Sequence, residues 1–479
     1  MLNRPKLIGL AYDYVLFMSQ SKKYNAQTLA NVCLLEKLGK KEVVKILQRP
    51  LSVFSKDHHY DKVRDFVYKS DYFTPRNIYL INPLFYVYYT YLAFALVELF
   101  LKDAYDLDFS KENMKIFYSG FLSLESSKEE IRENSKFNKS YNLFQEERKK
   151  YFGNPVLKID IQDFFNSIKV NNLINKLNRL LGPQEIIDQL EYFFNYCKLE
   201  SLPQFHYSIA SSILSQLYLN DFDSKMAVFT RKENLHLIRF VDDMFIVHLD
   251  GREDRNKDNY ILNEISYFLW QDELVLNTSK TKILTSDEYA DNYELVESEY
   301  EETSSFFSER LVEERAEQII DNGEFTLLID ELYKLEKSDG MDLKEYKNLV
   351  TKHISIEGED SNKVINNIIF SRKWQRLEVD DLKKIVHKWK YILFNPNQFT
   401  VLYIMVYQYL EEIGAVEEKD VQTYEVLDYL FKSKGFNFRD SLVAVSYLFQ
   451  NNLRNQELLD KIKEINPNYV EFIRTYISR

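Results

Sequence analysis

Glycine, proline and cysteine are all scarce in this chain of 479 residues, which contains 11 Gly, 9 Pro and 2 Cys. So few turn-forming residues argue against an all-β fold with many tight turns and favour long helices. Cys33 and Cys197 lie far apart in the sequence, and neither a disulfide framework nor a zinc site is evident. We therefore expect a reducing, cytoplasmic setting.

An excess of basic residues is also missing. The chain has 62 Lys and Arg against 74 Asp and Glu, for a net charge of −12. Because a basic surplus is the usual mark of a nucleic-acid binder, any such binding needs a local basic surface. The lysine-rich segment 22–56 could supply one, although a solvated helical face explains it equally well.

A long apolar run is absent too. Residues 78–97 carry no charge, but Asn82 and Pro83 interrupt them and tyrosine is frequent. A membrane span needs about 20 predominantly apolar residues, and the continuous apolar part here is shorter. We interpret the stretch as a buried helix that begins near Pro83, and we expect no membrane partner.

Two apolar runs of high β propensity, 237–241 and 244–249, flank Asp242 and Asp243. The pattern predicts a β-hairpin with two carboxylates at its tip, where Gly or Asn would be usual. A surface hairpin with a polar tip is one interpretation. The other is a metal site, because adjacent carboxylates repel each other unless a cation lies between them, and Mg²⁺ prefers oxygen ligands.

A third carboxylate follows another predicted strand. Residues 156–168 indicate a short strand that ends at Asp160 and a turn into a helix. From the carboxyl end of that strand, Asp160 could point across a sheet at the hairpin tip and complete a carboxylate set for two-metal phosphoryl transfer. Alternatively, Asp160 caps the following helix, a role that Asp163 could equally fill.

Four stretches, in this order, resemble the sequence motifs of reverse transcriptases. They are motif A at 156–168, motif B at 201–219, motif C at 237–249 and motif D at 274–284. Each match alone would be weak, but four in the family's order make a specific signal. The resemblance implies an α+β fold, with fingers and palm arranged as a right hand and an antiparallel palm sheet.

Within that family, the sequence is most similar to the abortive-infection and defence-associated bacterial polymerases. The resemblance to those proteins implies that this chain has three parts. Fingers and palm would comprise residues 1–285, an acidic linker 286–305, and an all-α, helical-repeat-like C-terminal domain 306–479. The later residues are compatible with this, because they read as successive amphipathic helices. Trp374 and Trp389 could line a strand channel there, but tryptophan at helical spacing is more often core.

The resemblance assigns a role to seven residues. Asp160, Asp242 and Asp243 would hold two Mg²⁺ ions, for which Mn²⁺ could substitute. For the incoming nucleotide, Arg76 would bind the triphosphate, and the ring of Phe165 would exclude a 2′-hydroxyl. Gln204 would contact the nucleotide, and Lys280 would act as a general acid. Each of these four also has a plain structural interpretation, as a loop or surface side chain or, for Phe165, as core.

One position departs from the family pattern. Motif B usually has a glycine after Pro-Gln, and here that position is Phe205. Because only glycine lets backbone approach a ligand so closely, we expect unusual handling of the template. Nearby, Arg148 precedes motif A and is expected to face solvent.

The resemblance implies a DNA polymerase that acts in bacterial anti-phage defence by abortive infection. It would use deoxynucleoside triphosphates, release single-stranded DNA, and form a homo-oligomer; protein-primed synthesis without a template is one suggested mode. One alternative is a non-catalytic nucleic-acid-binding or scaffold protein that retains the fold. Others are a reverse transcriptase templated by a partner non-coding RNA, or a ribonucleotide transferase, against which Phe165 argues.

Overall fold

The computed structural model describes nine stretches of the chain: 3–21, 26–67, 76–102, 104–291, 310–335, 343–354, 361–388, 396–415 and 456–477. The chain divides into two compact units. The first comprises 1–23, 27–64 and 78–293, and the second comprises 24–26, 65–77 and 294–479. Helices and strands are both present, which confirms the predicted mixed character of the fold.

A five-stranded sheet forms the centre of the first unit, in the order β3-β6-β7-β4-β8. Its strands are β3 (Met114–Phe117), β4 (Val156–Ile159), β6 (Leu235–Phe240), β7 (Asp243–His248) and β8 (Lys282–Leu284). All neighbours are antiparallel except β3 and β6, which run parallel, so the expected antiparallel sheet has one parallel pair at its edge.

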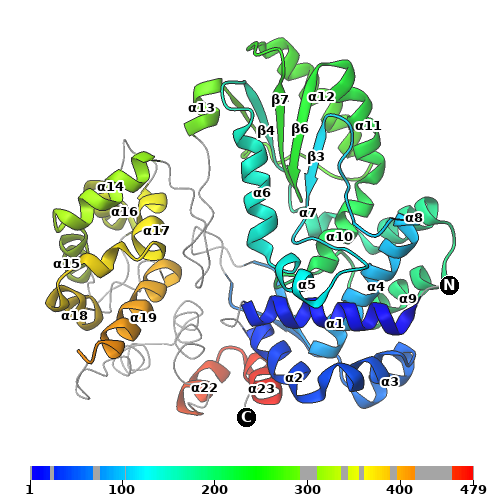
Figure 1. The fold of residues 1–479 in the computed structure, drawn as a ribbon, viewed down its shortest axis with the longest axis horizontal. Coiled ribbons are helices and arrows are strands. Elements are labelled where there is room, and N and C mark those ends of the chain that lie inside the picture. The colour runs from blue at the N-terminus through cyan, green and yellow to red at the C-terminus, as the bar shows by residue number, and fades with distance from the viewer. Residues whose placement is uncertain are drawn as a thin grey trace. The chain divides into compact units, whose positions relative to one another are not determined.

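Helices cover both faces of this sheet (Figure 1). Helix α6 (Phe137–Lys149) lies on one face, and α11 (Asn220–Lys232) and α12 (Arg255–Trp270) lie on the other. Side chains alternate along a strand, so Phe240 of β6 packs against Phe144 of α6 while its neighbour Arg239 meets Asp223 of α11. Both faces of β6 and β7 are covered, so nearly every residue of these strands is buried, including Arg239 and His248.

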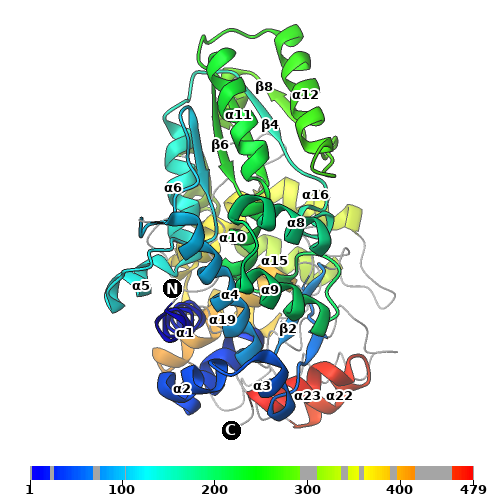
Figure 2. The same cartoon turned by 90° about the vertical axis from the view of Figure 1, so that its right-hand side faces the viewer.

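Helix α4 (Pro83–Leu101) is the core helix of the first unit, and Figure 2 shows it among its neighbours. Asn82 caps it, because the Asn82 side chain accepts a hydrogen bond from the N–H of Leu84 at 3.0 Å. By length and composition alone α4 could cross a membrane, but every residue from Pro83 to Val97 is buried. The prediction of a buried helix that begins at Pro83 is confirmed.

The remaining elements of the first unit are mostly helical at the N-terminus. Three short strands form a second sheet in the order β1-β2-β5: β1 (Lys62–Arg64), β2 (Ile78–Ile81) and β5 (Gln204–Phe205). The other helices are α1 (Arg4–Ser21), α2 (Ala26–Leu47), α3 (Leu51–Asp57), α5 (Lys128–Asn134), α7 (Phe164–Ser167), α8 (Val170–Leu181), α9 (Glu185–Tyr196), α10 (Ile209–Tyr218) and α13 (Ser286–Asp291).

Two local expectations fail next to the sheet. Arg148 is buried rather than solvent-facing, with its guanidinium carbon 3.9 Å from the ring centroid of Phe245, because a planar cation can stack on an aromatic face. The first residues of the predicted acidic linker form α13, whose buried Tyr289 donates a hydrogen bond to the Arg148 carbonyl at 3.1 Å. Residues 292–305 of that linker lie outside the described stretches.

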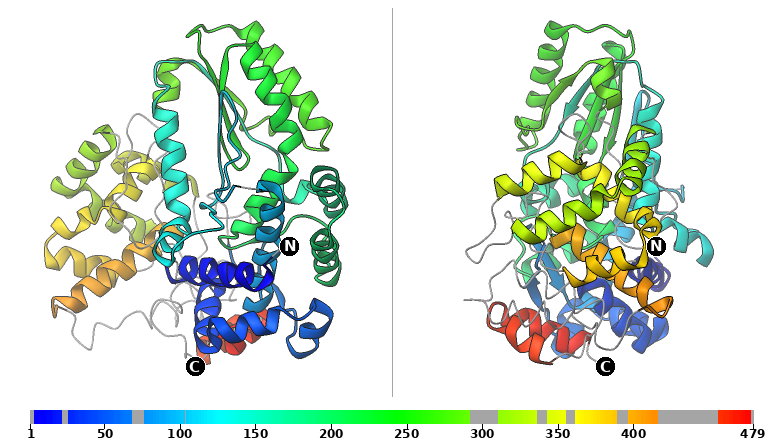
Figure 3. Two further views of the ribbon diagram at one scale, coloured as in Figure 1. Left: turned by 45° about the vertical axis from the view of Figure 1, so that its right-hand side comes forward. Right: turned by 90° about the vertical axis from the view of Figure 1, so that its left-hand side faces the viewer.

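In the second unit, every described element is a helix (Figure 3, yellow to red). These elements are α14 (Arg310–Asp321), α15 (Glu324–Leu335), α16 (Leu343–Ile354), α17 (Ser361–Phe370), the 3₁₀ turn Lys373–Arg376, α18 (Val379–His387), α19 (Pro396–Glu412), α22 (Gln456–Lys463) and α23 (Pro467–Tyr476). Trp374 is buried in their core and its Nε1 donates to the Ile369 carbonyl at 3.0 Å, which confirms the core interpretation; Trp389 is not described.

Candidate active site

The hairpin of β6 and β7 is confirmed, but its tip is one residue earlier than predicted. Phe240 pairs with Asp243, so Val241 and Asp242 form the two-residue turn and Asp243 is the first residue of β7. Val241 has a φ of 55°. Two-residue hairpin turns need positive φ at this position, where Gly or Asn is normal, and a β-branched residue there is strained by about 1–3 kcal/mol.

Strand β4 brings Asp160 to the same end of the sheet. Ile159 pairs with Met244 of β7, so the next residue, Asp160, is level with Asp243. Asp160 is buried, whereas Asp242 and Asp243 are partly exposed. Asp163, and not Asp160, occupies the N-cap of α7, so the alternative that Asp160 is a helix cap is wrong. The structure therefore places the three carboxylates that the sequence singled out at the same end of the sheet.

Like charge accumulates at this end of the sheet. Burial, followed by the negative charges of Asp243 and Asp160, raises the pKa of Asp242 to about 7. The nearby Lys280 opposes the rise. A carboxyl that is half protonated near neutral pH indicates negative charge in excess of its compensation, and a cation would relieve that excess.

Lys280 and Asn277 hold the Asp160 carboxylate. Lys280 Nζ lies 3.0 Å from Asp160 Oδ2, and Asn277 Nδ2 donates to Asp160 Oδ1 at 2.8 Å. Burial lowers the pKa of Lys280, but the hydrogen bond from Lys280 to Asp160 and the charges of all three carboxylates outweigh it and raise that pKa. Lys280 thus remains a cation at the site. Sequence reasoning missed Asn277, although an Asn opening the turn before Lys280 was a usable signal.

The residues assigned to the incoming nucleotide differ in how buried they are and in which unit of the chain they lie. Phe164 is core, while the adjacent Phe165 is partly buried with its ring centroid 5.4 Å from that of Phe164. Gln204 is partly exposed in β5. Arg76 is exposed and belongs to the second unit, where its N–H donates to the Val67 carbonyl at 2.7 Å. The nucleotide contacts of all three stay predictions.

The structure also gives Phe205 a packing role. Its side chain is buried, with ring centroids 6.1 Å from Tyr86 and 5.7 Å from Tyr89 of α4. Tyr86 further donates to the His206 carbonyl at 2.6 Å. Because neighbouring residues of a strand face opposite ways, the face of the loop that carries Gln204 is not covered by the Phe205 ring. The large side chain at this position is therefore used to attach the motif B loop to α4.

The three carboxylates are suitable ligands for a divalent cation, but their side chains do not surround a single binding position. Carboxylate oxygens are the ligands that Mg²⁺ prefers, and the raised pKa of Asp242 shows where added positive charge would be stabilised. Among the described residues, however, no three Asp, Glu, His or Cys side chains are near enough to hold a metal ion together. Each oxygen of Asp160 already accepts one hydrogen bond, so a cation bound there would share this carboxylate with the Lys280 ammonium group or displace it.

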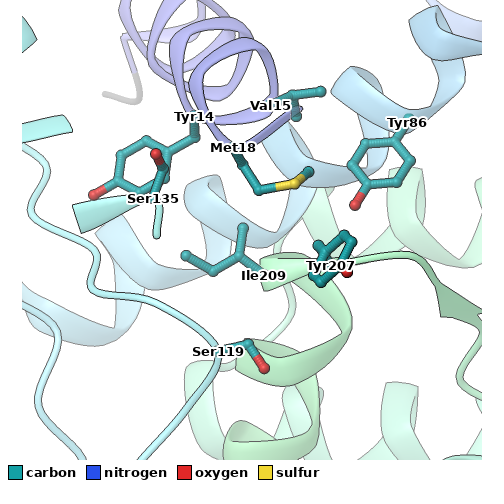
Figure 4. Close-up of a pocket in the computed structure, with 8 residues that line it drawn as sticks. All are labelled: Tyr14, Val15, Met18, Tyr86, Ser119, Ser135, Tyr207 and Ile209. Atoms are coloured by element: carbon teal, nitrogen blue, oxygen red, sulfur yellow. The ribbon is translucent and has the colours of Figure 1, made fainter. Parts of the chain in front are cut away.

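Two hollows of the first unit lie away from the carboxylates. The cavity in Figure 4, between α1, α4 and α10, measures about 10 Å³ and has room for at most one water molecule. A larger polar hollow of about 520 Å³ lies against α8 and includes the buried ion pair of Lys176 and Asp272. Neither contains any of the seven residues that the sequence assigned to the site.

Comparisons with known proteins give a family for this part of the chain. Residues 104–315 match the family described as "Reverse transcriptase (RNA-dependent DNA polymerase)". No curated protein matches. One similar solved structure is telomerase from Candida albicans in complex with the TWJ fragment of telomeric RNA, at 13% identity and a TM-score of 0.24. That likeness covers 61% of this chain and 52% of the telomerase chain, so this chain spans about half of its length. Residues 104–315 are therefore similar to a reverse transcriptase domain, over somewhat less than half of the chain.

Proposed function

We propose that this protein is a DNA polymerase of the reverse-transcriptase type that adds deoxynucleotides to a primer hydroxyl. The observation that carries the proposal is the meeting of Asp160 with Asp242 and Asp243, which are 82 and 83 residues later in the chain, on adjacent antiparallel strands. Helix caps and surface turns do not require such a meeting. A site for phosphoryl transfer does, because it must concentrate negative charge around cations.

In this proposal the three carboxylates hold two Mg²⁺ ions, or Mn²⁺ in their place. Bound there, such ions lower the pKa of the attacking hydroxyl and stabilise the charge of the leaving pyrophosphate. Lys280 releases Asp160 when the site is loaded and turns its ammonium group to the pyrophosphate, where it holds charge or donates a proton. Its raised pKa supports this role, because the lysine reaches the substrate protonated.

The remaining assigned residues select and position the nucleotide. Phe165 crowds a 2′-hydroxyl and so selects deoxynucleotides. Gln204 hydrogen-bonds the nucleotide from the uncovered face of the motif B loop, and Arg76 binds the triphosphate with its planar fork. Replacing Phe165 by Ala should raise ribonucleotide incorporation relative to deoxynucleotide incorporation. Unchanged discrimination in single-nucleotide assays would remove this assignment.

The cellular role that we propose is anti-phage defence by abortive infection in a bacterial cytoplasm, with the protein acting as a homo-oligomer. The similarity of the four motifs to defence-associated polymerases supports it. We further propose protein-primed synthesis without a template. Product that stays attached to the protein after denaturation and is released by protease supports priming by the protein. A strict requirement for added RNA would instead favour an RNA-templated enzyme.

Incorporation of labelled deoxynucleotides by the purified protein with Mg²⁺ is the main test. The wild-type protein should incorporate label, and the variant with both Asp242→Ala and Asp243→Ala should not. A second candidate function, a scaffold that keeps the fold without catalysis, is favoured by one observation: Lys280 and Asn277 occupy both oxygens of Asp160. Equal behaviour of the two proteins would select the scaffold.

A further inference from the structure

A charge pair lies buried directly beneath the hairpin tip. Arg239 of β6 and Asp223 of α11 have side chains that are 0% and 2% exposed. Arg239 Nη2 is 2.7 Å from Asp223 Oδ1 and 2.6 Å from Oδ2. The other terminal nitrogen, Nη1, donates to the carbonyl of Val241 at 3.2 Å. The guanidinium therefore joins helix α11 to the turn that carries Asp242.

Stability alone is a poor explanation for this pair. Removing two charges from water costs several kcal/mol per ion, and apolar residues of similar volume often serve a core equally well or better. The second hydrogen bond is also unusual in its target. Arg239 reaches a backbone carbonyl two residues further along the chain, in the turn, and that carbonyl belongs to the strained residue Val241.

Both peptide groups of Val241 are fixed by other parts of the first unit. The Val241 N–H donates to the carbonyl of Phe117 in β3 at 3.1 Å, and the Val241 carbonyl accepts from Arg239. That carbonyl is part of the peptide group that leads into Asp242, so holding it sets the orientation in which Asp242 leaves the turn. A valine with a φ of 55° keeps such a conformation only where its surroundings impose it.

We infer that Arg239, oriented by Asp223, is a positioning residue: it holds the Val241–Asp242 peptide so that Asp242 and Asp243 face Asp160. This inference rests on the proposed function, because it assigns to the pair the geometry of that site. Lysine cannot replace the arginine here, since one ammonium group lacks the planar fork that reaches a carboxylate and a carbonyl together. The charge of Arg239 matters less than its two separate donors.

The test compares two changes at the pair with a matched change elsewhere. Arg239→Lys keeps the charge and loses the fork, and the double change Arg239→Met with Asp223→Leu removes both charges without altering net charge. The control is Lys176→Met with Asp272→Leu, which removes another buried ion pair of the first unit, one with side chains 8% and 6% exposed. In that control pair, Lys176 Nζ donates to the Tyr218 carbonyl at 2.9 Å, and its partner carboxylate is that of Asp272, so the pair is tied to α10 and not to the hairpin.

Two quantities are measured on each folded protein: steady-state incorporation of deoxynucleotides, and Mn²⁺ binding followed by electron paramagnetic resonance. Both Arg239 variants should lose about ten- to a hundredfold in kcat and in Mn²⁺ affinity, with KM for the nucleotide nearly unchanged. The control should keep wild-type values. Wild-type kcat and Mn²⁺ affinity in either folded Arg239 variant would overturn the inference.

A rescue separates positioning from general packing. Glycine adopts a φ of 55° without strain, so Val241→Gly combined with Arg239→Lys should recover part of the lost Mn²⁺ affinity. A variant that only loosens the core would not be repaired by removing a side chain from the turn, so absence of rescue counts against the inference. If Arg239→Lys does not fold, the apolar double variant decides.

The two proposals fail in different ways. An inactive wild-type protein overturns the proposed function, whereas the Mn²⁺ measurements still report whether Arg239 organises the carboxylates. If the wild-type protein is active and binds Mn²⁺ but the Arg239 variants match it, only the positioning role is wrong.

Discussion

The two ends of the β6–β7 hairpin are built on opposite principles. At the base, His248 Nε2 lies 2.8 Å from Asp258 Oδ1, and the His248 carbonyl accepts from Asn154 Nδ2 at 2.8 Å. At the tip, a strained Val241 and a crowded Asp242 stand close to two further carboxylates. At the base, both of these polar groups have a partner, although His248 Nδ1 is buried without one. At the tip, negative charge exceeds its compensation, so an added positive charge would be stabilised there.

Removing a carboxylate from the tip should have the largest effect. Asp160→Asn should lower deoxynucleotide incorporation by at least about a hundredfold, because the variant keeps the shape of the site and loses the charge that holds the ions. The matched control is Asp163→Asn. Asp163 is exposed three residues later at φ 46°, a conformation that Asn tolerates, and its variant should retain activity. Equal loss in both variants would contradict the assignment of Asp160.

Metal binding at the tip should depend on pH. With the pKa of Asp242 raised to about 7, protons compete with cations below neutrality. Raising the pH from about 6 to about 8 should therefore tighten Mn²⁺ binding by roughly tenfold, measured by calorimetry in buffers of equal ionic strength. In Asp242→Asn this dependence should flatten. A wild-type affinity that does not change over this range would contradict metal binding by an Asp242 whose pKa is raised.

Breaking the base should cost stability and leave chemistry intact. Asp258→Asn removes the charge beside buried His248 and should lower the free energy of unfolding by about 1–3 kcal/mol, measured by urea denaturation. Incorporation per folded molecule at low temperature should stay near the wild-type value. Loss of activity without loss of stability would mean that the base also serves the site, and the contrast between the two ends would fail.

Relieving charge at the tip should have the smallest effect and the opposite sign. The folded-state pKa of Asp242 is raised from 3.8 to about 7, so the metal-free fold is favoured while Asp242 is protonated and loses stability as the pH rises through about 7. Asp242→Asn mimics the protonated form. Its Tm without metal should exceed that of wild type by a few degrees at about pH 8 and by less at about pH 5.5. A lower Tm at about pH 8 would contradict the excess of charge.

Local patterns predicted the parts of the fold that depend on neighbours in sequence. Two apolar runs of high β propensity predicted β6 and β7, and an uncharged stretch after Asn82-Pro83 predicted the buried helix α4. The position of the turn was missed by one residue, because nothing local indicates that Val241 would accept a positive φ. That conformation depends on Phe117 and Arg239 and therefore on the assembled sheet.

For the site, too, the sequence predicts some features and leaves others to the tertiary structure. Which side chains carry charge, and which of them follow strands, is written in the sequence, so Asp160, Asp242 and Asp243 could be named from it. Lys280 was named through the resemblance of residues 274–284 to motif D. Their partners could not be named in this way. The contacts of Asp160 with Asn277, of Arg239 with Asp223, and of Phe205 with Tyr89 join residues up to 117 positions apart.

The sequence by itself determined that carboxylates end two strands and that a long apolar helix is buried, because hydrophobic burial and turn preference act on adjacent residues. Only the tertiary structure decided that these carboxylates meet, that Lys280 lies against Asp160, and that a buried arginine holds the turn. Strand pairing brings residues that are far apart in the chain into contact with each other. The charges acquire their shared electrostatic environment only when β4 pairs with β7.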